Sequence, residues 1–125
     1  MPYDPSNIFA RILRGEIPCN KAHETEHALA FHDINPQTPV HVLVIPKGPY
    51  VSSDDFHDRA GDAEIAGFWR AVGETARALG VERSGYRLLA NHGRDARQEV
   101  PHFHVHICGG ADLGRMIRPP EKARG

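Results

Sequence analysis

The sequence predicts an α+β domain in which helices cover an antiparallel sheet. Two short stretches are typical of strands: 40–45 is apolar and rich in β-branched residues, and 102–108 alternates apolar residues with histidines. A longer stretch, 62–79, repeats its apolar residues at helical spacing. The expected order along the chain is helix, strands, long helix, strands, which favours this fold class.

The N-terminal half is expected to form one short helix and three strands. Residues 7–14 have an apolar helical face, with Ser6 or Asn7 as the capping residue. Two weakly alternating stretches within 21–33 are interpreted as paired strands. A proline-rich turn at 35–39 then leads into the buried strand 40–45.

The C-terminal half is expected to hold the long helix and two more strands. A polar loop is predicted over 54–61, and the helix 62–79 follows, with a glycine at its C-terminal end. Residues 86–90 are predicted to be a strand, 91–100 a polar loop, and 102–108 the last strand. This arrangement makes a long polar loop the direct neighbour of the last strand.

The chain is short enough for a single domain. At 125 residues it can bury about two-thirds of the surface that its unfolded form exposes. We expect one domain over 1–125, with its core at about 7–110 and an irregular tail at 111–125. The formal net charge of -1 argues against a nucleic acid or an anionic membrane surface as partner.

Targeting signals are not evident in the sequence. No apolar stretch approaches the ~20 residues of a membrane-spanning helix, and the N-terminus lacks the pattern of a signal peptide. Cys19 and Cys108 are far apart and are not expected to form a disulfide. These features together indicate a cytoplasmic protein.

The last predicted strand carries three histidines at alternating positions. Residues 102–108 read HFHVHIC, and successive side chains of a strand point to opposite faces. One face is therefore expected to carry His102, His104 and His106, and the other Phe103, Val105 and Ile107. Imidazole can act as nucleophile, proton donor or metal ligand near neutral pH, so this strand is the strongest functional signal in the chain.

Three interpretations of these histidines are open. A purely structural role is common for one histidine but weak for three on one face, because neighbouring imidazoles repel when protonated. A metal site is possible but not favoured, because alternate residues at about 3.3 Å per residue spread the outer two by about 13 Å. Two of them with another ligand such as His41 could still bind a metal.

The third interpretation is nucleophilic catalysis. The central imidazole, His104, would attack the substrate while its neighbours hold the substrate and handle protons. His41, within the strand 40–45, is a candidate to complete the site. The loop 91–100 would supply polar contacts.

The motif His-φ-His-φ-His-φ-φ, where φ is an apolar residue, resembles the signature of the histidine triad family. Further stretches resemble the branch of histidine triad nucleotide-binding proteins: IFARILRGEIPCNKAHET, ALAFHDINPQTPVHVLVIPK, YRLLANHG and QEVPHFHVHICGG. The resemblance implies a five-stranded antiparallel sheet with two helices, and a homodimer in which two sheets join into one. It also implies cleavage of purine nucleoside phosphoramidates or related nucleotide conjugates, with no cofactor and no metal.

The resemblance also implies a role for individual residues. His104 corresponds to a nucleophile that forms a covalent nucleotidyl-histidine, His106 to a phosphate contact, and His102 and His41 to a supporting network. The implied nucleotide contacts are Asp33 at the ribose hydroxyls, Asn91 and Gln98 near the ribose and phosphate, and Phe9, Ile12, Phe31 and Ile34 around the base.

Two residues of the loop depart from the family pattern. Arg97 stands where the family commonly has glycine, and we interpret it as a contact to the leaving-group side of the substrate. Glu99 stands where some members carry a hydroxyl residue, and it could act as an acid only with a raised pKa. Two other functions remain open: a dinucleoside-polyphosphate hydrolase of the same family, and a nucleotide-binding regulator with little turnover.

Overall fold

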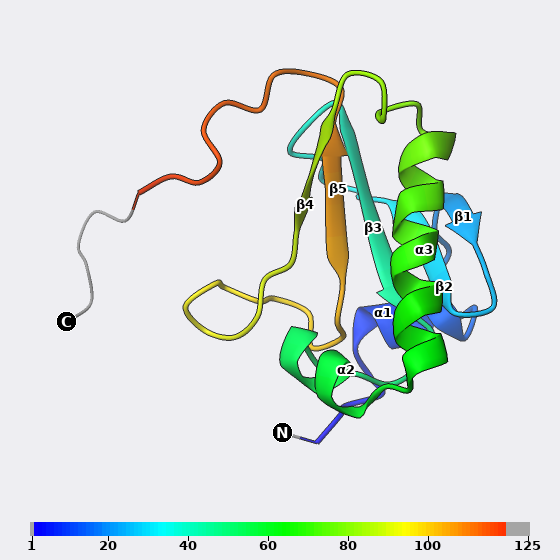
Figure 1. Ribbon diagram of the computed structural model, residues 1–125. Helices are drawn as coiled ribbons and strands as arrows, with labels where there is room; N and C mark the ends of the chain where they lie inside the picture. Colours follow the sequence, from blue (N-terminus) through cyan, green and yellow to red (C-terminus); the bar gives the residue numbers. More distant parts are fainter. Residues whose placement is uncertain (1, 120–125) are drawn as a thin grey trace.

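The computed structural model describes residues 2–119 and contains one five-stranded antiparallel sheet (Figure 1). The strand order is β1-β2-β3-β5-β4, so β1 and β4 form the two edges. The strands are β1 (Lys21–Glu24), β2 (Ala28–His32), β3 (Val40–Pro46), β4 (Tyr86–Leu89) and β5 (Val105–Gly109). The predicted fold class, α+β with a five-stranded antiparallel sheet, is confirmed.

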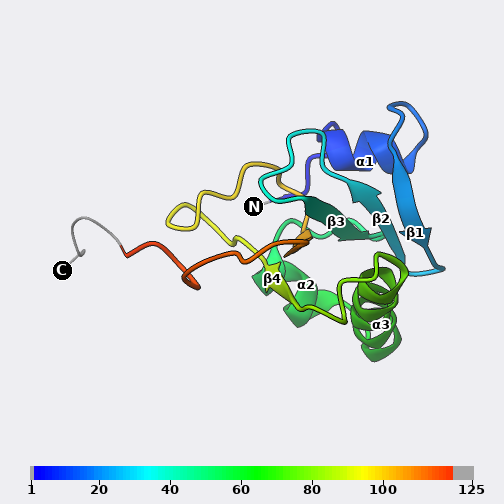
Figure 2. The ribbon, with the colours of Figure 1, turned by 90° about the horizontal axis from the view of Figure 1, so that it is seen from above.

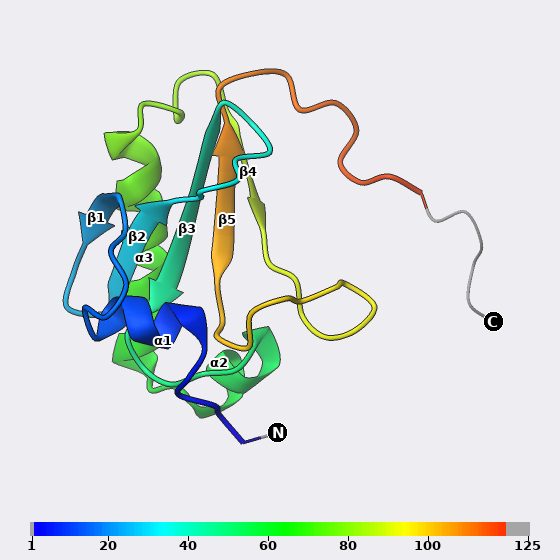
Figure 3. The same cartoon turned by 180° about the vertical axis from the view of Figure 1, so that it is seen from behind.

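Helices cover both faces of the sheet. The short helix α1 (Ile8–Leu13) lies on one face and the long helix α3 (Asp62–Ala78) on the other, as the view from above shows (Figure 2). From behind, α1 crosses one end of the sheet (Figure 3). These are the two predicted helices, and α3 ends before Gly80, whose φ of 76° suits a glycine.

A third helix, α2 (Ser53–Arg59), occupies the segment that was predicted to be a polar loop. The Ser52 side chain caps it by accepting a hydrogen bond from the Asp55 N–H. Within the helix, the side chain of Phe56 is completely buried. The loop prediction was wrong because one buried aromatic residue is too few to reveal a helical period.

The two central strands divide the core by alternation. Phe103, Val105 and Ile107 pack on the α3 side together with Val42 and Val44 of β3. This larger core also contains the buried aromatic residues of α2 and α3. A second, smaller cluster lies on the α1 side and comprises Phe9, Leu29, Phe31, Leu43 and Ile45.

The histidine strand is shorter than predicted, because β5 begins only at Val105. Before it, the Phe103 N–H donates to the carbonyl of Tyr50 instead of to the neighbouring strand β3. The histidines therefore do not share one open strand face: His102 is completely buried, whereas His106 is half-buried.

After β5 the described tail, 111–119, contains bends but neither helix nor strand, and it runs away from the sheet (Figure 1). The Arg87 guanidinium holds its start by donating to the carbonyls of Gly114 and Arg115. Residues 120–125 of the predicted tail lie outside the described residues. Between residues 2 and 119, no helix is long and apolar enough to cross a membrane.

Candidate active site

A cleft of about 730 Å³ opens on the α1 side of the sheet. Its walls come from α1, the ends of β2 and β3, the loop 91–100 and the histidine segment. The sequence-predicted residues that line it are Phe9, Ile12, Phe31, Asp33, Ile34, His41, Asn91, Arg97, Glu99, His104 and His106. A cleft of this size can hold a small organic ligand.

His104 has one nitrogen free to react. Its Nδ1 lies 2.8 Å from the carbonyl oxygen of His102, and because a carbonyl only accepts, Nδ1 must carry the proton. The lone pair of the neutral ring is then on Nε2. Burial lowers the pKa of His104, although the hydrogen bond to His102 and the carboxylates of Asp33 and Glu99 oppose that shift. A neutral, nucleophilic imidazole follows.

His106 has the opposite tautomer, which follows from its contact with His41. The Gln37 N–H donates to His41 Nδ1 at 2.9 Å, so the proton of a neutral His41 is on Nε2. His41 Nε2 lies 2.8 Å from His106 Nδ1 and donates to it, which leaves the His106 proton on Nε2. Burial, with the neighbouring imidazoles, lowers the pKa of His106 to about 4. His104 therefore presents a lone pair, and His106 an N–H donor.

His102 supports the site from behind and does not line the cleft. Its Nε2 donates to the carbonyl of Pro46 at 2.9 Å, and its Nδ1 lies 2.6 Å from the hydroxyl of Tyr3. Burial lowers the pKa of His102 to about 4, so the ring is neutral near pH 7. No sequence pattern indicates Tyr3, because its contact with His102 spans 99 residues of chain and leaves no spacing signal.

A metal ion fits poorly beside these histidines. Among the described residues, Asp33, His41 and His106 bring one ligand atom each within 4.8 Å of one another. A metal on His41 Nε2 would need the lone pair of that nitrogen, but Nδ1 already uses one to accept the Gln37 N–H. A neutral imidazole has only one such lone pair. Proton transfer and hydrogen bonding suit this cluster better.

The apolar half of the cleft lies between α1 and the sheet. Phe9 packs edge to face against Phe31, with ring centroids 5.5 Å apart, and against His104 at 5.0 Å. Ile12 packs on the same cluster, while Ile34 stands at the rim with 88% of its surface exposed. Leu43 and Cys19 also line this half, and neither was predicted from the sequence.

The loop 91–100 contributes both signs of charge to the cleft. Arg97 is the one arginine or lysine among the described lining residues, and its φ of 56° is left-handed. Gln98 lies outside the cleft. Its amide nitrogen donates to the carbonyls of Val51 and Val100, and its oxygen accepts from the Gly93 N–H. The Gln98 amide therefore holds the loop. A direct contact between Gln98 and a nucleotide stays a prediction.

Comparison with known proteins identifies the family. Residues 14–113 match the model of the HIT domain, the histidine triad, and the chain therefore belongs to this family. An uncharacterised 13.2 kDa HIT-like protein of Azospirillum brasilense is 68% identical over 115 residues, which are 92% of this chain and 94% of the relative.

Solved structures agree with this assignment. A HIT family hydrolase from Clostridium thermocellum is 34% identical, with a TM-score of 0.79 over 90% of this chain and 97% of its own. A histidine triad nucleotide-binding protein from Candida albicans is 31% identical, with a TM-score of 0.80 over 96% of this chain and 87% of its own. The fold and the histidine motif thus place the chain among proteins described as hydrolases and nucleotide-binding proteins.

Proposed function

We propose that this protein hydrolyses purine nucleoside phosphoramidates or related nucleotide conjugates and releases the nucleoside monophosphate. The observation that carries the proposal is the His104 tautomer: its Nδ1 proton is held by the His102 carbonyl, so its Nε2 lone pair is available at the cleft. The neighbouring His106 offers a complementary N–H donor. This pairing suits attack on a phosphorus atom that carries anionic oxygens.

The proposed reaction has two steps. His104 Nε2 attacks the α-phosphorus and forms a P–N bond, while the P–N bond to the leaving amine breaks and that amine takes a proton from water. Water then attacks the same phosphorus and gives its proton to the hydroxide left by the first step, while the bond to His104 breaks and its electron pair returns to Nε2. The His106 N–H stabilises the non-bridging oxygens in both steps, and the His102 carbonyl stabilises the transient positive charge on His104.

The rest of the cleft supports a nucleotide as substrate. The apolar half offers Phe9 and Phe31 to a purine base, and the Asp33 carboxylate is assigned to the ribose hydroxyls. Asp33 is held in place because its Oδ1 accepts the Asn35 N–H at 2.8 Å. Asn91 and Glu99 remain as polar contacts near the sugar and phosphate.

We also propose a cytoplasmic homodimer joined through the edge strand β4. That strand has one partner, β5, within the described chain, so its outer edge is open to pairing. Its side chains Tyr86, Leu88 and Leu89 are each about two-fifths exposed. An open apolar edge is the type of surface that a second sheet covers.

Chemical trapping of the intermediate tests the proposed function. The protein is mixed with adenosine phosphoramidate, quenched within one turnover, and analysed by mass spectrometry for an adenylyl group on the peptide that contains His104. The adduct should form in the wild type and in the control His57→Ala, which changes an exposed histidine outside the cleft. It should be absent from His104→Ala. Turnover by His104→Ala without an adduct would exclude the mechanism.

The two other functions give different outcomes. Faster turnover of diadenosine polyphosphates than of adenosine phosphoramidate would indicate the polyphosphate hydrolase. Binding of AMP with no hydrolysis of either compound would indicate a regulator.

A further inference from the structure

The N-terminal segment reaches the back of the histidine site through a single side chain. Tyr3 is half-buried, and its hydroxyl lies 2.6 Å from Nδ1 of the completely buried His102. The two rings meet edge to face, with centroids 5.6 Å apart. No other residue in the described chain hydrogen-bonds to this nitrogen, so Tyr3 supplies its partner.

The direction of this hydrogen bond is fixed by its surroundings. His102 Nε2 faces the carbonyl of Pro46, which only accepts, so Nε2 carries the proton and Nδ1 the lone pair. The Tyr3 hydroxyl must then donate to Nδ1. The imidazole of His102 is thus held at both nitrogens, by a donor from the N-terminus and by an acceptor from β3.

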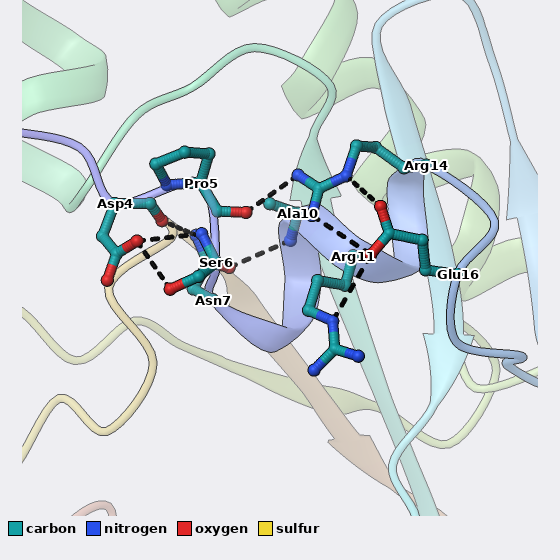
Figure 4. Close-up of polar contacts among 8 residues, drawn as sticks. All are labelled: Asp4, Pro5, Ser6, Asn7, Ala10, Arg11, Arg14 and Glu16. Carbon is teal, nitrogen blue, oxygen red and sulfur yellow. Dashed lines mark hydrogen bonds and ion pairs between the residues drawn. The ribbon is translucent and has the colours of Figure 1, made fainter.

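The segment that carries Tyr3 is itself held firmly against α1 (Figure 4). Asn7 caps the helix by accepting the Ala10 N–H and also donates to the Asp4 carbonyl. Asp4 accepts from both the N–H and the hydroxyl of Ser6. The Arg14 guanidinium, paired with Glu16, donates to the Pro5 carbonyl at 2.8 Å. Residues 4–7 therefore form a hydrogen-bonded turn beside Tyr3.

His102 in turn holds the nucleophile through its own backbone. Its carbonyl accepts the His104 Nδ1 proton at 2.8 Å and so determines which nitrogen of His104 is free. Phe9 contacts both imidazoles, with centroids 6.4 Å from His102 and 5.0 Å from His104. A rotation of the His102 ring would disturb the peptide unit and the packing that orient His104.

We propose that Tyr3 is a positioning residue for the nucleophile: by donating to His102 Nδ1 it locks the His102 ring and, through the His102 carbonyl, the orientation of His104. The inference rests on the proposed function, in which His104 attacks phosphorus. Tyr3 touches no reacting atom, so its contribution appears in the attack step and not in substrate binding. The N-terminal turn is then part of the site, although it lies outside the cleft.

Tyr3→Phe tests this inference with a matched control. The variant removes one hydroxyl and keeps the ring that packs on His102. The control Tyr50→Phe removes a comparable phenol, bonded to Glu64 at 2.8 Å and outside the cleft. Single-turnover adduct formation should slow about three- to ten-fold in Tyr3→Phe, with KM unchanged, because a neutral hydrogen bond is lost from the attack step. Tyr50→Phe should form the adduct at the wild-type rate.

Imidazole ¹⁵N NMR provides a readout that needs no substrate. In Tyr3→Phe the His102 Nδ1 signal should shift toward the position of a nitrogen without a hydrogen bond, and the His104 Nδ1 proton should exchange faster with water. An unchanged adduct rate, an equal slowing in both variants, or unchanged NMR signals would overturn the inference. Full turnover by His104→Ala would instead remove the proposed function, so the two failures are distinguishable.

Discussion

The two faces of the sheet at β3 and β5 have different roles, although the residues of both faces alternate along the same chain. Val105 and Ile107 face α3, where they join a large core with Val42 and Val44. His104 and His106 line the cleft on the other side, where the apolar cluster is small. The alternation of a strand thus separates the residues that stabilise the fold from those that carry the proposed chemistry.

The two faces also differ in the polarity of their buried side chains. On the α3 side, the rings of Phe56, Phe68 and Phe103 lie with centroids 4.9 to 5.3 Å apart, and all three are completely or nearly buried. On the cleft side, each buried imidazole has a hydrogen-bond partner, as with His102 and His104. Among the described side chains, no buried polar atom is left without a partner. Buried polar groups are tolerated there because their hydrogen bonds are complete.

The largest expected effects come from one substitution on each face. Phe68→Ala removes a completely buried ring and should lower the free energy of unfolding by about 3–5 kcal/mol, because a cavity remains. The folded fraction should keep its kcat. His104→Ala should lower turnover at least about 10³-fold, with a smaller loss of stability than Phe68→Ala. Urea unfolding and turnover per folded molecule measure both. If the two variants lost stability and activity in the same proportion, the faces would not be separate.

A pH-dependent loss of stability is expected from the cleft face. The pKa of His106 is about 4 in the folded protein and 6.5 as its ordinary value. Between these values the unfolded chain binds more protons, so stability is complete above about pH 6.5 and falls as the pH drops toward 4. Between about pH 7 and about pH 5, the lowered pKa of this one histidine should reduce the free energy of unfolding by about 2 kcal/mol.

His106→Asn isolates this contribution in urea unfolding at both pH values. On acidification, the free energy of unfolding of the variant should fall by about 2 kcal/mol less than that of the wild type. Part of the pH dependence should remain in the variant, because the pKa of His102 is also lowered to about 4. The control His57→Asn changes an exposed histidine and should lose as much as the wild type. An equal loss in all three proteins would contradict the depressed pKa of His106.

Gln98→Ala distinguishes a loop anchor from a nucleotide contact. Its amide makes hydrogen bonds of 2.7 Å to Val51, 3.1 Å to Val100 and 3.2 Å to Gly93. Their loss should reduce the free energy of unfolding by about 1–2 kcal/mol and speed hydrogen exchange at the Gly93 amide without ligand. His92→Ala, at an exposed loop position, is the control. Weaker nucleotide binding with unchanged exchange would instead favour a direct contact.

The smallest effect is expected from Arg97→Gly. Glycine relieves the left-handed φ of 56° but adds freedom to the unfolded chain, so stability should change by less than about 1 kcal/mol. The kcat/KM for substrates whose leaving amine carries a carboxylate should fall about five-fold, because one exposed cation is lost. Neutral leaving amines should be unaffected. Arg94→Gly serves as control, and equal kinetics for both substrate types in Arg97→Gly would exclude a leaving-group contact.

Local patterns predicted those parts of the site that lie on a strand or directly beside one. The alternation over 102–108 separated His104 and His106 from Phe103, Val105 and Ile107, and the structure keeps that division. His102, which was predicted on the same face as His104 and His106, does not line the cleft. Such patterns work because side-chain direction in a strand depends on neighbouring residues alone. The helix α2 was not predicted, because Phe56 is its only buried residue and one residue shows no period.

The sequence by itself determined the fold class, the order of the main elements and the histidine motif, since each depends on spacing along the chain. Only the tertiary structure decided how the three histidines differ: His102 is buried behind the site, and His104 and His106 present opposite tautomers. Those differences depend on Pro46, His41 and Tyr3, whose contacts with His102 and His106 join segments that are distant in the sequence. A hydrogen bond between such segments leaves no periodic trace in the sequence, because it is made only when the chain has folded.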